Sequence, residues 1–168
     1  MSSDSGGLVG AVASNPFAGE WNWRAGALAG FLAAVVAGVA VSVVRLETLR
    51  LAVAGLYGFE GSLLAGWVAH LVHGVVFGLV FAWVLSDPGF YHLADSWWKT
   101  LLAAVAYAVV LAVAGAGIIM PIWLGLLGGP ALGPLPYVTW SLFGWHVLYG
   151  VVLGVAYPVV EHRVAPDR

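Results

Sequence analysis

Four long apolar segments, separated by short stretches that hold all the charged residues, make up most of the chain. They cover residues 25–44, 62–85, 100–119 and 138–160, and none of them contains Asp, Glu, Lys or Arg. A helix needs about 20 apolar residues to cross the hydrocarbon core of a bilayer, where it satisfies its own backbone hydrogen bonds. Strands of membrane barrels alternate apolar and polar positions, which these segments do not. The pattern therefore predicts an all-α membrane protein with four transmembrane helices.

The second and fourth segments carry the same landmarks at the same spacing. When residues 70–81 are aligned with residues 146–157 without a gap, four pairs coincide: His70 with His146, Gly74 with Gly150, Gly78 with Gly154, and Phe81 with Tyr157. An apolar span and a connection rich in Leu and Gly precede each set of landmarks. Repeats related by an axis along the membrane normal occur in transporters, among other membrane proteins. The chain is therefore predicted to consist of two repeated helical hairpins.

These hairpins divide the chain into three parts. Residues 1–24 form an N-terminal tail that is apolar enough to lie at the membrane surface. Residues 25–85 form the first hairpin, and residues 86–168 form the second hairpin with a short C-terminal tail. The connections within the two hairpins differ: residues 46–57 have the spacing of a short interfacial helix, whereas residues 128–136 contain three prolines and cannot form a regular helix.

Composition narrows the class of protein further. Of the 168 residues, 62% are hydrophobic and only 8% are charged. A soluble domain has about 25% charged residues, so this chain is not an ordinary soluble enzyme. There is no cysteine, which excludes disulfides and thiolate chemistry, and the net charge of −2 offers no basic surface for nucleic acid. The expected partners are the lipid bilayer and either other membrane subunits or further copies of this chain.

Cationic residues gather on one side of the predicted bundle. The side with both termini has four Lys or Arg residues and the opposite side has two: Arg24, Lys99, Arg163 and Arg168 against Arg45 and Arg50. Cytoplasmic loops carry such an excess, and tryptophans before the first and third spans fit the same membrane interface. The distribution predicts a multi-pass protein of the cell membrane with cytoplasmic N- and C-termini.

Three histidines are the ionisable side chains inside the predicted spans, and such residues are functional candidates because lipid disfavours them. His70 and His146 each lie about eight residues into their spans, ~12 Å below the same membrane face. Two imidazoles at one depth suit the axial ligation of haem b, and His73 lies nearly one turn from His70. The three histidines could instead bind a copper, zinc or nickel ion, or simply hydrogen-bond to neighbouring helices.

Several stretches resemble a group of small membrane proteins from haloarchaea. They are LYG at 56–58, LAGWVAH at 64–70 and HGVVFG at 73–78, with GWH at 144–146 and YG at 149–150 in the second half. The resemblance implies a four-helix protein of an archaeal membrane and brings no established catalytic residues. Members of this group are often labelled histidine kinases by automatic naming. A kinase needs a soluble ATP-binding domain, and no soluble stretch of this chain is long enough to fold as one.

Motifs of catalysis are missing from the sequence, which has no P-loop, GxGxxG or HExxH pattern. We therefore expect no enzyme but a non-catalytic integral membrane subunit of a larger complex, with electron transfer, as in a respiratory complex, as its leading role. The alternative is a small transporter or channel built on the two-fold repeat. Its polar lining would come from the histidines and from Ser42, Tyr107 and Ser141.

Overall fold

The computed structural model describes residues 21–164, and this part of the chain is helical without any strand. Its elements, in chain order, are α1 (Trp23–Glu47), the π-helix η1 (Thr48–Val53), α2 (Leu63–Ser86), the 3-10 helix η2 (Tyr91–Leu93), α3 (Trp97–Val110), the π-helix η3 (Leu111–Ile119), α4 (Met120–Leu126) and α5 (Trp140–Val164). Within the described residues, four helical segments are long and apolar enough to cross a membrane: Trp23–Val53, Leu63–Ser86, Trp97–Leu126 and Trp140–Val164.

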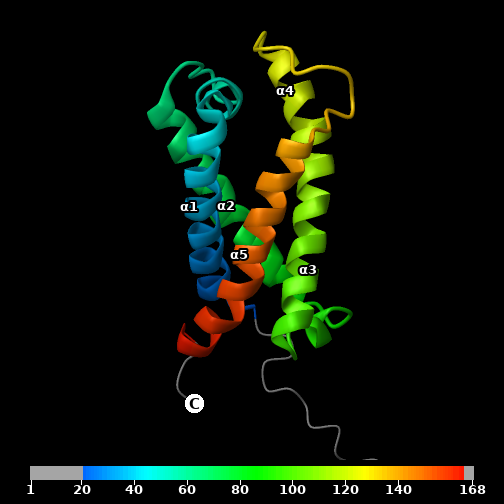
Figure 1. Ribbon diagram of the computed structural model, residues 1–168. Helices are drawn as coiled ribbons and strands as arrows, with labels where there is room; N and C mark the ends of the chain where they lie inside the picture. Colours follow the sequence, from blue (N-terminus) through cyan, green and yellow to red (C-terminus); the bar gives the residue numbers. More distant parts are fainter. Residues whose placement is uncertain (1–20, 165–168) are drawn as a thin grey trace, which may run out of the picture.

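Residues 46–57 contain a separate helix, as the sequence predicted. The helical φ and ψ angles break at Arg45 (−147° and 62°), and beyond this kink the helix continues through η1 and runs across the end of the bundle (Figure 1). The third segment extends farther than predicted. The third segment continues past residue 119 through η3 into α4. Pro121 lies in the first turn of α4 and does not end the segment, although it has no N–H to donate to a carbonyl of η3.

Both ends of the chain also differ from the predicted boundaries. Trp23 and Arg24 already belong to α1, so the predicted N-terminal tail ends before them, and its first 20 residues lie outside the described part. The fourth segment continues through Val164. Residues 128–136 form no helix, in agreement with their three prolines. The backbone N–H of Tyr137 donates to the carbonyl of Gly117 at 2.7 Å, which holds this connection against η3.

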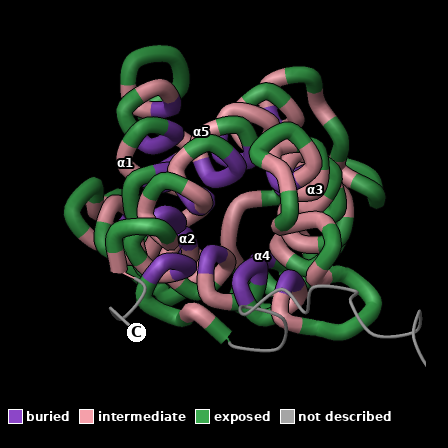
Figure 2. Tube along the Cα trace, turned by 90° about the horizontal axis from the view of Figure 1, so that it is seen from below, coloured by how far each residue is buried: buried purple, intermediate pink, exposed green. Residues whose placement is uncertain are grey.

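Four long helices form an up-and-down bundle in which α1 and α5 are the central pair. Helix α1 packs along α2 and α5, and α5 packs in turn along α3. The described ends of the chain lie together at one end of the bundle, the lower end in Figure 1, and η1 and α4 lie at the opposite end. Buried positions face the neighbouring helices and exposed positions surround them (Figure 2). Large apolar side chains such as Leu64 and Val43 are mostly exposed on this outside, which suits lipid better than water.

Glycines allow the closest helix contacts in both halves of the chain. A Cβ added to Gly78 would lie 2.7 Å from the Cα of Gly30, so α1 and α2 meet backbone to backbone. A Cβ added to Gly150 would lie 2.7 Å from the Cβ of Ala108, and the same close approach joins α5 to α3. Small residues of this kind let helices approach closely where lipid provides no hydrophobic drive for association. The glycines of α2 therefore contact α1, and the glycines of α5 contact α3.

Candidate functional site

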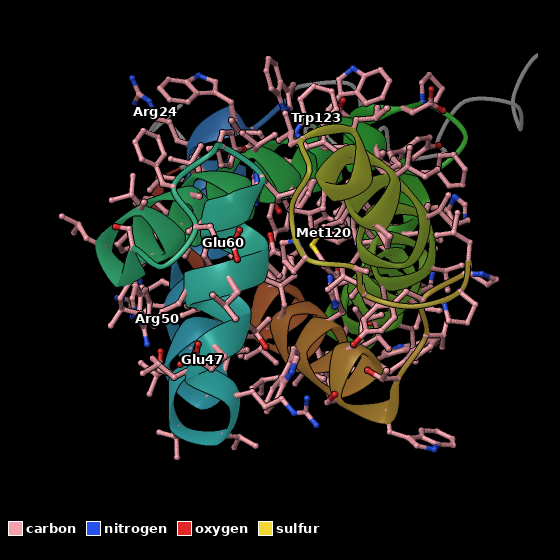
Figure 3. All side chains as sticks on the ribbon, turned by 90° about the horizontal axis from the view of Figure 1, so that it is seen from above. Arg24, Glu47, Arg50, Glu60, Met120 and Trp123 are labelled. Atoms are coloured by element: carbon pink, nitrogen blue, oxygen red, sulfur yellow. The ribbon has the colours of Figure 1, made fainter. Side chains whose placement is uncertain are left out.

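A cavity of about 660 Å³ lies in the half of the bundle away from the described chain ends. Its walls come from all four long segments, and most of them are apolar, with Val41, Leu49, Phe77, Leu111 and Leu142 among the lining residues. Figure 3 looks into this end of the bundle, where Met120 of α4 points toward the middle. A volume of this size is in the range of small-molecule sites, about 300–1,000 Å³.

Of the described residues, none that lines the cavity carries a formal charge. Glu47 and Arg50 form an ion pair of 3.1 Å near the same end, but both side chains are exposed and neither lines the cavity. The polar groups in the lining belong to three histidines, two tyrosines, two tryptophans and a threonine: His70, His73, His146, Tyr57, Tyr149, Trp123, Trp145 and Thr48. The cavity is therefore neutral as well as largely apolar.

His70 is held against α1. Its Nε2 donates a hydrogen bond to the carbonyl oxygen of Ala34 at 2.9 Å, since a carbonyl can only accept. The ring fits there because Gly38 has no side chain: a Cβ at Gly38 would lie 2.9 Å from the His70 Cδ2 atom. The Trp67 ring meets the His70 ring edge-on, with 6.1 Å between their centroids. Only the Nδ1 atom of His70 is left for another partner.

His146 is fixed in the opposite way. Its Nδ1 donates to the carbonyl oxygen of Leu142, one turn earlier in α5, at 2.8 Å. The distal nitrogen, Nε2, therefore keeps its lone pair when the imidazole is neutral. This hydrogen bond to a carbonyl is the usual support for a histidine that ligates a metal. Of the two histidines, His146 keeps its Nε2 atom for a ligand, whereas the Nε2 atom of His70 is already hydrogen-bonded.

His73 is paired with a residue to which the sequence reasoning gave no role. Its Nε2 and the hydroxyl of Tyr57 share a hydrogen bond of 2.6 Å, and its ring stacks on Phe77 with a centroid separation of 5.9 Å. Tyr57 lies just after η1, 16 residues before its partner. Tyr57 belongs to the LYG stretch at residues 56–58, but nothing in that stretch indicates that its hydroxyl pairs with a histidine on α2.

Tyrosines close the cavity toward the end of the bundle that holds the described chain ends. The hydroxyl of Tyr149 donates to the carbonyl of Gly74 at 2.8 Å, and the hydroxyl of Tyr107 donates to the carbonyl of Phe77 at 3.0 Å. The rings of Phe81 and Tyr107 pack below, 5.6 Å apart, and Phe81 also meets Tyr157 edge-on at 5.7 Å. This aromatic layer ties α3 and α5 to α2 and lies beyond the lining of the cavity, on the side of the described chain ends.

At the other end, α4 reaches across to the first half of the chain. The indole Nε1 of Trp123 donates to the carbonyl of Leu56 at 2.9 Å, and Leu124 packs beside Gly55. This contact joins the two predicted hairpins above the cavity. The other polar candidates from the sequence do not extend the site: Ser141 pairs with Thr139 at 3.1 Å, and Ser42 Oγ is buried without a hydrogen-bond partner among residues 21–164.

A Tyr149→Phe variant is expected to lose little stability. It removes one hydrogen bond between α5 and α2 and keeps the ring, and hydrogen bonds between membrane helices average about 0.6 kcal/mol. Reversible unfolding in mixed detergent micelles would measure the loss, with Tyr91→Phe in η2 as the control. A loss above about 2 kcal/mol would contradict this expectation and show that this hydrogen bond holds the bundle together.

The predicted haem and metal ligands were tested against this geometry. Ligation by the Nε2 atoms of both His70 and His146 would require the His70 ring to leave the Ala34 carbonyl. Among the described residues, no Lys or Arg lines the cavity to meet the two propionates of a haem. Within residues 21–164, no group of three His, Cys, Asp or Glu side chains is arranged to hold a metal ion. His146 could therefore serve as one axial ligand of a haem, but the Nε2 atom of His70 is not available as the second ligand.

The chain was compared with family models, with curated proteins and with solved structures, and no family model, curated protein or solved structure matches it.

Proposed function

We propose that this chain is a non-enzymatic integral membrane subunit that holds a lipophilic cofactor in its histidine-lined cavity and works within a larger complex, most simply one that transfers electrons. The observation that carries the proposal is the cavity itself. A neutral, largely apolar space of about 660 Å³ that places three histidines among four long apolar helices is a binding site for a lipophilic molecule rather than an ordinary packed core.

A two-fold repeat of helical hairpins is part of the proposal. Gly78 and Gly154 occupy equivalent positions, and each meets the preceding span of its own half with backbone-level contact. His70 and His146 are also equivalent, and both line the cavity. The resemblance to small haloarchaeal membrane proteins remains a prediction beside these contacts. The repeat supports a shared site between two halves of similar design.

Haem b is the cofactor that the sequence predicted for this site. His146 would hold it, because its Nδ1 is already bonded to a carbonyl and its Nε2 is available. A bound haem would supply one-electron transfer. His70 would first have to give up its hydrogen bond to Ala34, which makes a haem with two histidine ligands the less direct occupant of the cavity.

Purification from its native membrane in mild detergent tests the proposal. We expect the chain to co-purify with other polypeptides and with an extractable lipophilic molecule, and an absorption spectrum with a Soret band would identify that molecule as haem. The parent protein is compared with His146→Ala, which should lose the bound molecule. An isolated chain that contains no extractable small molecule would overturn the proposal.

The proposed orientation places both termini in the cytoplasm and η1 with α4 outside. The chain has no cysteine, so single-cysteine variants give an unambiguous readout. We expect Glu60→Cys, between η1 and α2, to react with a membrane-impermeant maleimide in intact cells. His92→Cys in η2 should react only after the cells are permeabilised. The reverse labelling pattern would show that the excess of Lys and Arg does not set the orientation of this protein.

A small transporter is the second candidate, and the position of the cavity favours it. The cavity occupies one end of the bundle, and the aromatic layer of Phe81, Tyr107 and Tyr157, which does not line it, lies between it and the other end. A transport path would need that layer to open. Uptake of a hydrophobic dye into proteoliposomes would support this candidate if Tyr107→Ala accelerated it, and equal uptake with and without the protein would remove it.

A further inference from the structure

We infer that the cavity binds a neutral lipophilic molecule through a hydroxyl group that donates a hydrogen bond to His146 Nε2. This inference rests on the proposed use of the cavity as a binding site and names the chemical class of its ligand. Two chemistries share the required features, the reduced form of a quinone and a long-chain isoprenoid alcohol. Both combine an apolar body with a hydroxyl donor.

The lining of the cavity determines the charge of the ligand that it can accept. No described residue that lines the cavity is Asp, Glu, Lys or Arg, so an ionic group inside it would have no counter-ion. Burying an unpaired charge in an apolar space is costly enough that such groups are paired or absent. The nearest ion pair, Arg50 with Glu47, is already formed and exposed to solvent. A neutral molecule is the occupant that this lining accepts.

The lining also determines the direction of the hydrogen bond to the ligand. His146 uses its Nδ1–H on the Leu142 carbonyl, and His70 uses its Nε2–H on the Ala34 carbonyl. Each neutral ring then has one remaining nitrogen, and that nitrogen can only accept. Tyr149 likewise donates its proton to the Gly74 carbonyl. The remaining nitrogens of His70 and His146 can therefore only accept a hydrogen bond from the ligand. The Tyr57–His73 pair keeps one donor of its own, so the preference for a hydroxyl rests on His146 Nε2.

A ligand in the cavity must also be able to reach the acceptor atom, His146 Nε2. Ser42 Oγ is the buried side-chain polar atom without a partner in the described part of the chain. His146 Nε2 has no hydrogen-bond partner there either, but it is not sealed in the packing, and its residue lines the cavity. An accessible acceptor within an apolar space gives a ligand orientation as well as affinity. His146 is the better acceptor of the two candidates because its free nitrogen is Nε2, at the far end of the ring, whereas the free nitrogen of His70 is Nδ1, next to its own main chain.

The test compares three probes on the full-length protein in detergent, by anaerobic titration calorimetry. The probes are a decyl-substituted benzoquinol, the matching benzoquinone and farnesol. The quinol and the quinone have nearly the same size, but only the quinol can donate. We expect the quinol to bind at least tenfold more tightly than the quinone. If farnesol binds as tightly as the quinol, a hydroxyl group on an apolar tail is sufficient for binding. If farnesol binds more weakly, the quinol is the preferred class of ligand.

Variants assign the preference to the acceptor atom. His146→Phe keeps a ring of similar size and should reduce the ratio of quinol to quinone affinity to about one. His146→Gln, whose amide oxygen can accept, should recover part of the ratio. His92→Phe, an exposed position outside the cavity, should leave the ratio unchanged. The Phe and Gln variants together separate the loss of an acceptor from a loss of folding.

Equal affinity for quinol and quinone in the parent protein would overturn the inference, and so would a preference that survives in His146→Phe. Either result leaves the proposed function standing if a cofactor still co-purifies with the chain. A chain that co-purifies with no small molecule would overturn the proposed function instead, whatever the probes show. The two failures are therefore distinguishable.

Discussion

A Gly78→Val variant is expected to lose the packing between α1 and α2 and to unfold far more easily than the parent protein. Any Cβ at this position would lie 2.7 Å from the Cα of Gly30 and would also overlap the carbonyl oxygen of Gly26. Both obstacles are backbone atoms, so no side chain can rotate away to make room. Overpacking of this kind costs about 3 kcal/mol. Reversible unfolding in mixed detergent micelles would measure the loss.

Gly144→Val is the matched control. Gly144 also lies in a long helix, α5, but a Cβ there meets nothing within 4 Å. We expect a change of no more than about 0.5 kcal/mol, as for most surface substitutions. Equal losses at Gly78 and Gly144 would show that backbone contact is not what holds α1 to α2.

The same experiment tests the repeat. Gly154 is the counterpart of Gly78, and a Cβ there would lie 2.7 Å from the Cα of Leu101 in α3. A Gly154→Val loss close to that of Gly78→Val is expected if the two hairpins have the same design. A tolerated Gly154→Val would mean that the aligned glycines do not serve the same purpose in the two halves.

The four long helices could be predicted because length and hydropathy are local properties of a sequence. The extension of the third helix through η3 into α4 could not. A change from the α to the π pattern of hydrogen bonds keeps the chain helical and alters no feature of composition. The kink at Arg45 likewise has no proline or glycine at that position to mark it in the sequence. Helix boundaries were therefore the least accurate part of the sequence interpretation.

The candidate site, like the fold, could be predicted from the sequence only in part. The sequence predicted that His70 and His146 lie at similar depth on the inner faces of their helices, since equal spacing within a repeat gives equal depth. Both residues line the cavity. Their hydrogen-bond partners were not predictable, because the Ala34 carbonyl is 36 residues from His70 and no side chain marks it. The cavity itself was not predictable either. It is a space left where four long segments diverge, and no residue type signals such a space.

Filling the cavity with a larger side chain is expected to have a large effect on ligand binding. A Gly115→Phe variant should abolish binding of the co-purifying molecule, with affinity at least tenfold lower. Gly115 lies in η3 and lines the cavity, and a Cβ built there meets no atom within 4 Å. A phenyl ring can therefore enter the cavity without displacing the backbone. Because the ring gains van der Waals contact with apolar walls, the free energy of unfolding should stay the same or rise.

Gly125→Phe is the matched control for the filled cavity. Gly125 lies in α4, where a Cβ also meets nothing within 4 Å, but it is exposed and does not line the cavity. Ligand content and affinity should be unchanged in this variant. A cavity that is only a packing defect predicts a different result, in which Gly115→Phe is more stable and retains every bound molecule and partner. Stability gained together with binding lost, at Gly115 and not at Gly125, is therefore the outcome that separates a site maintained for a ligand from a void tolerated by the fold.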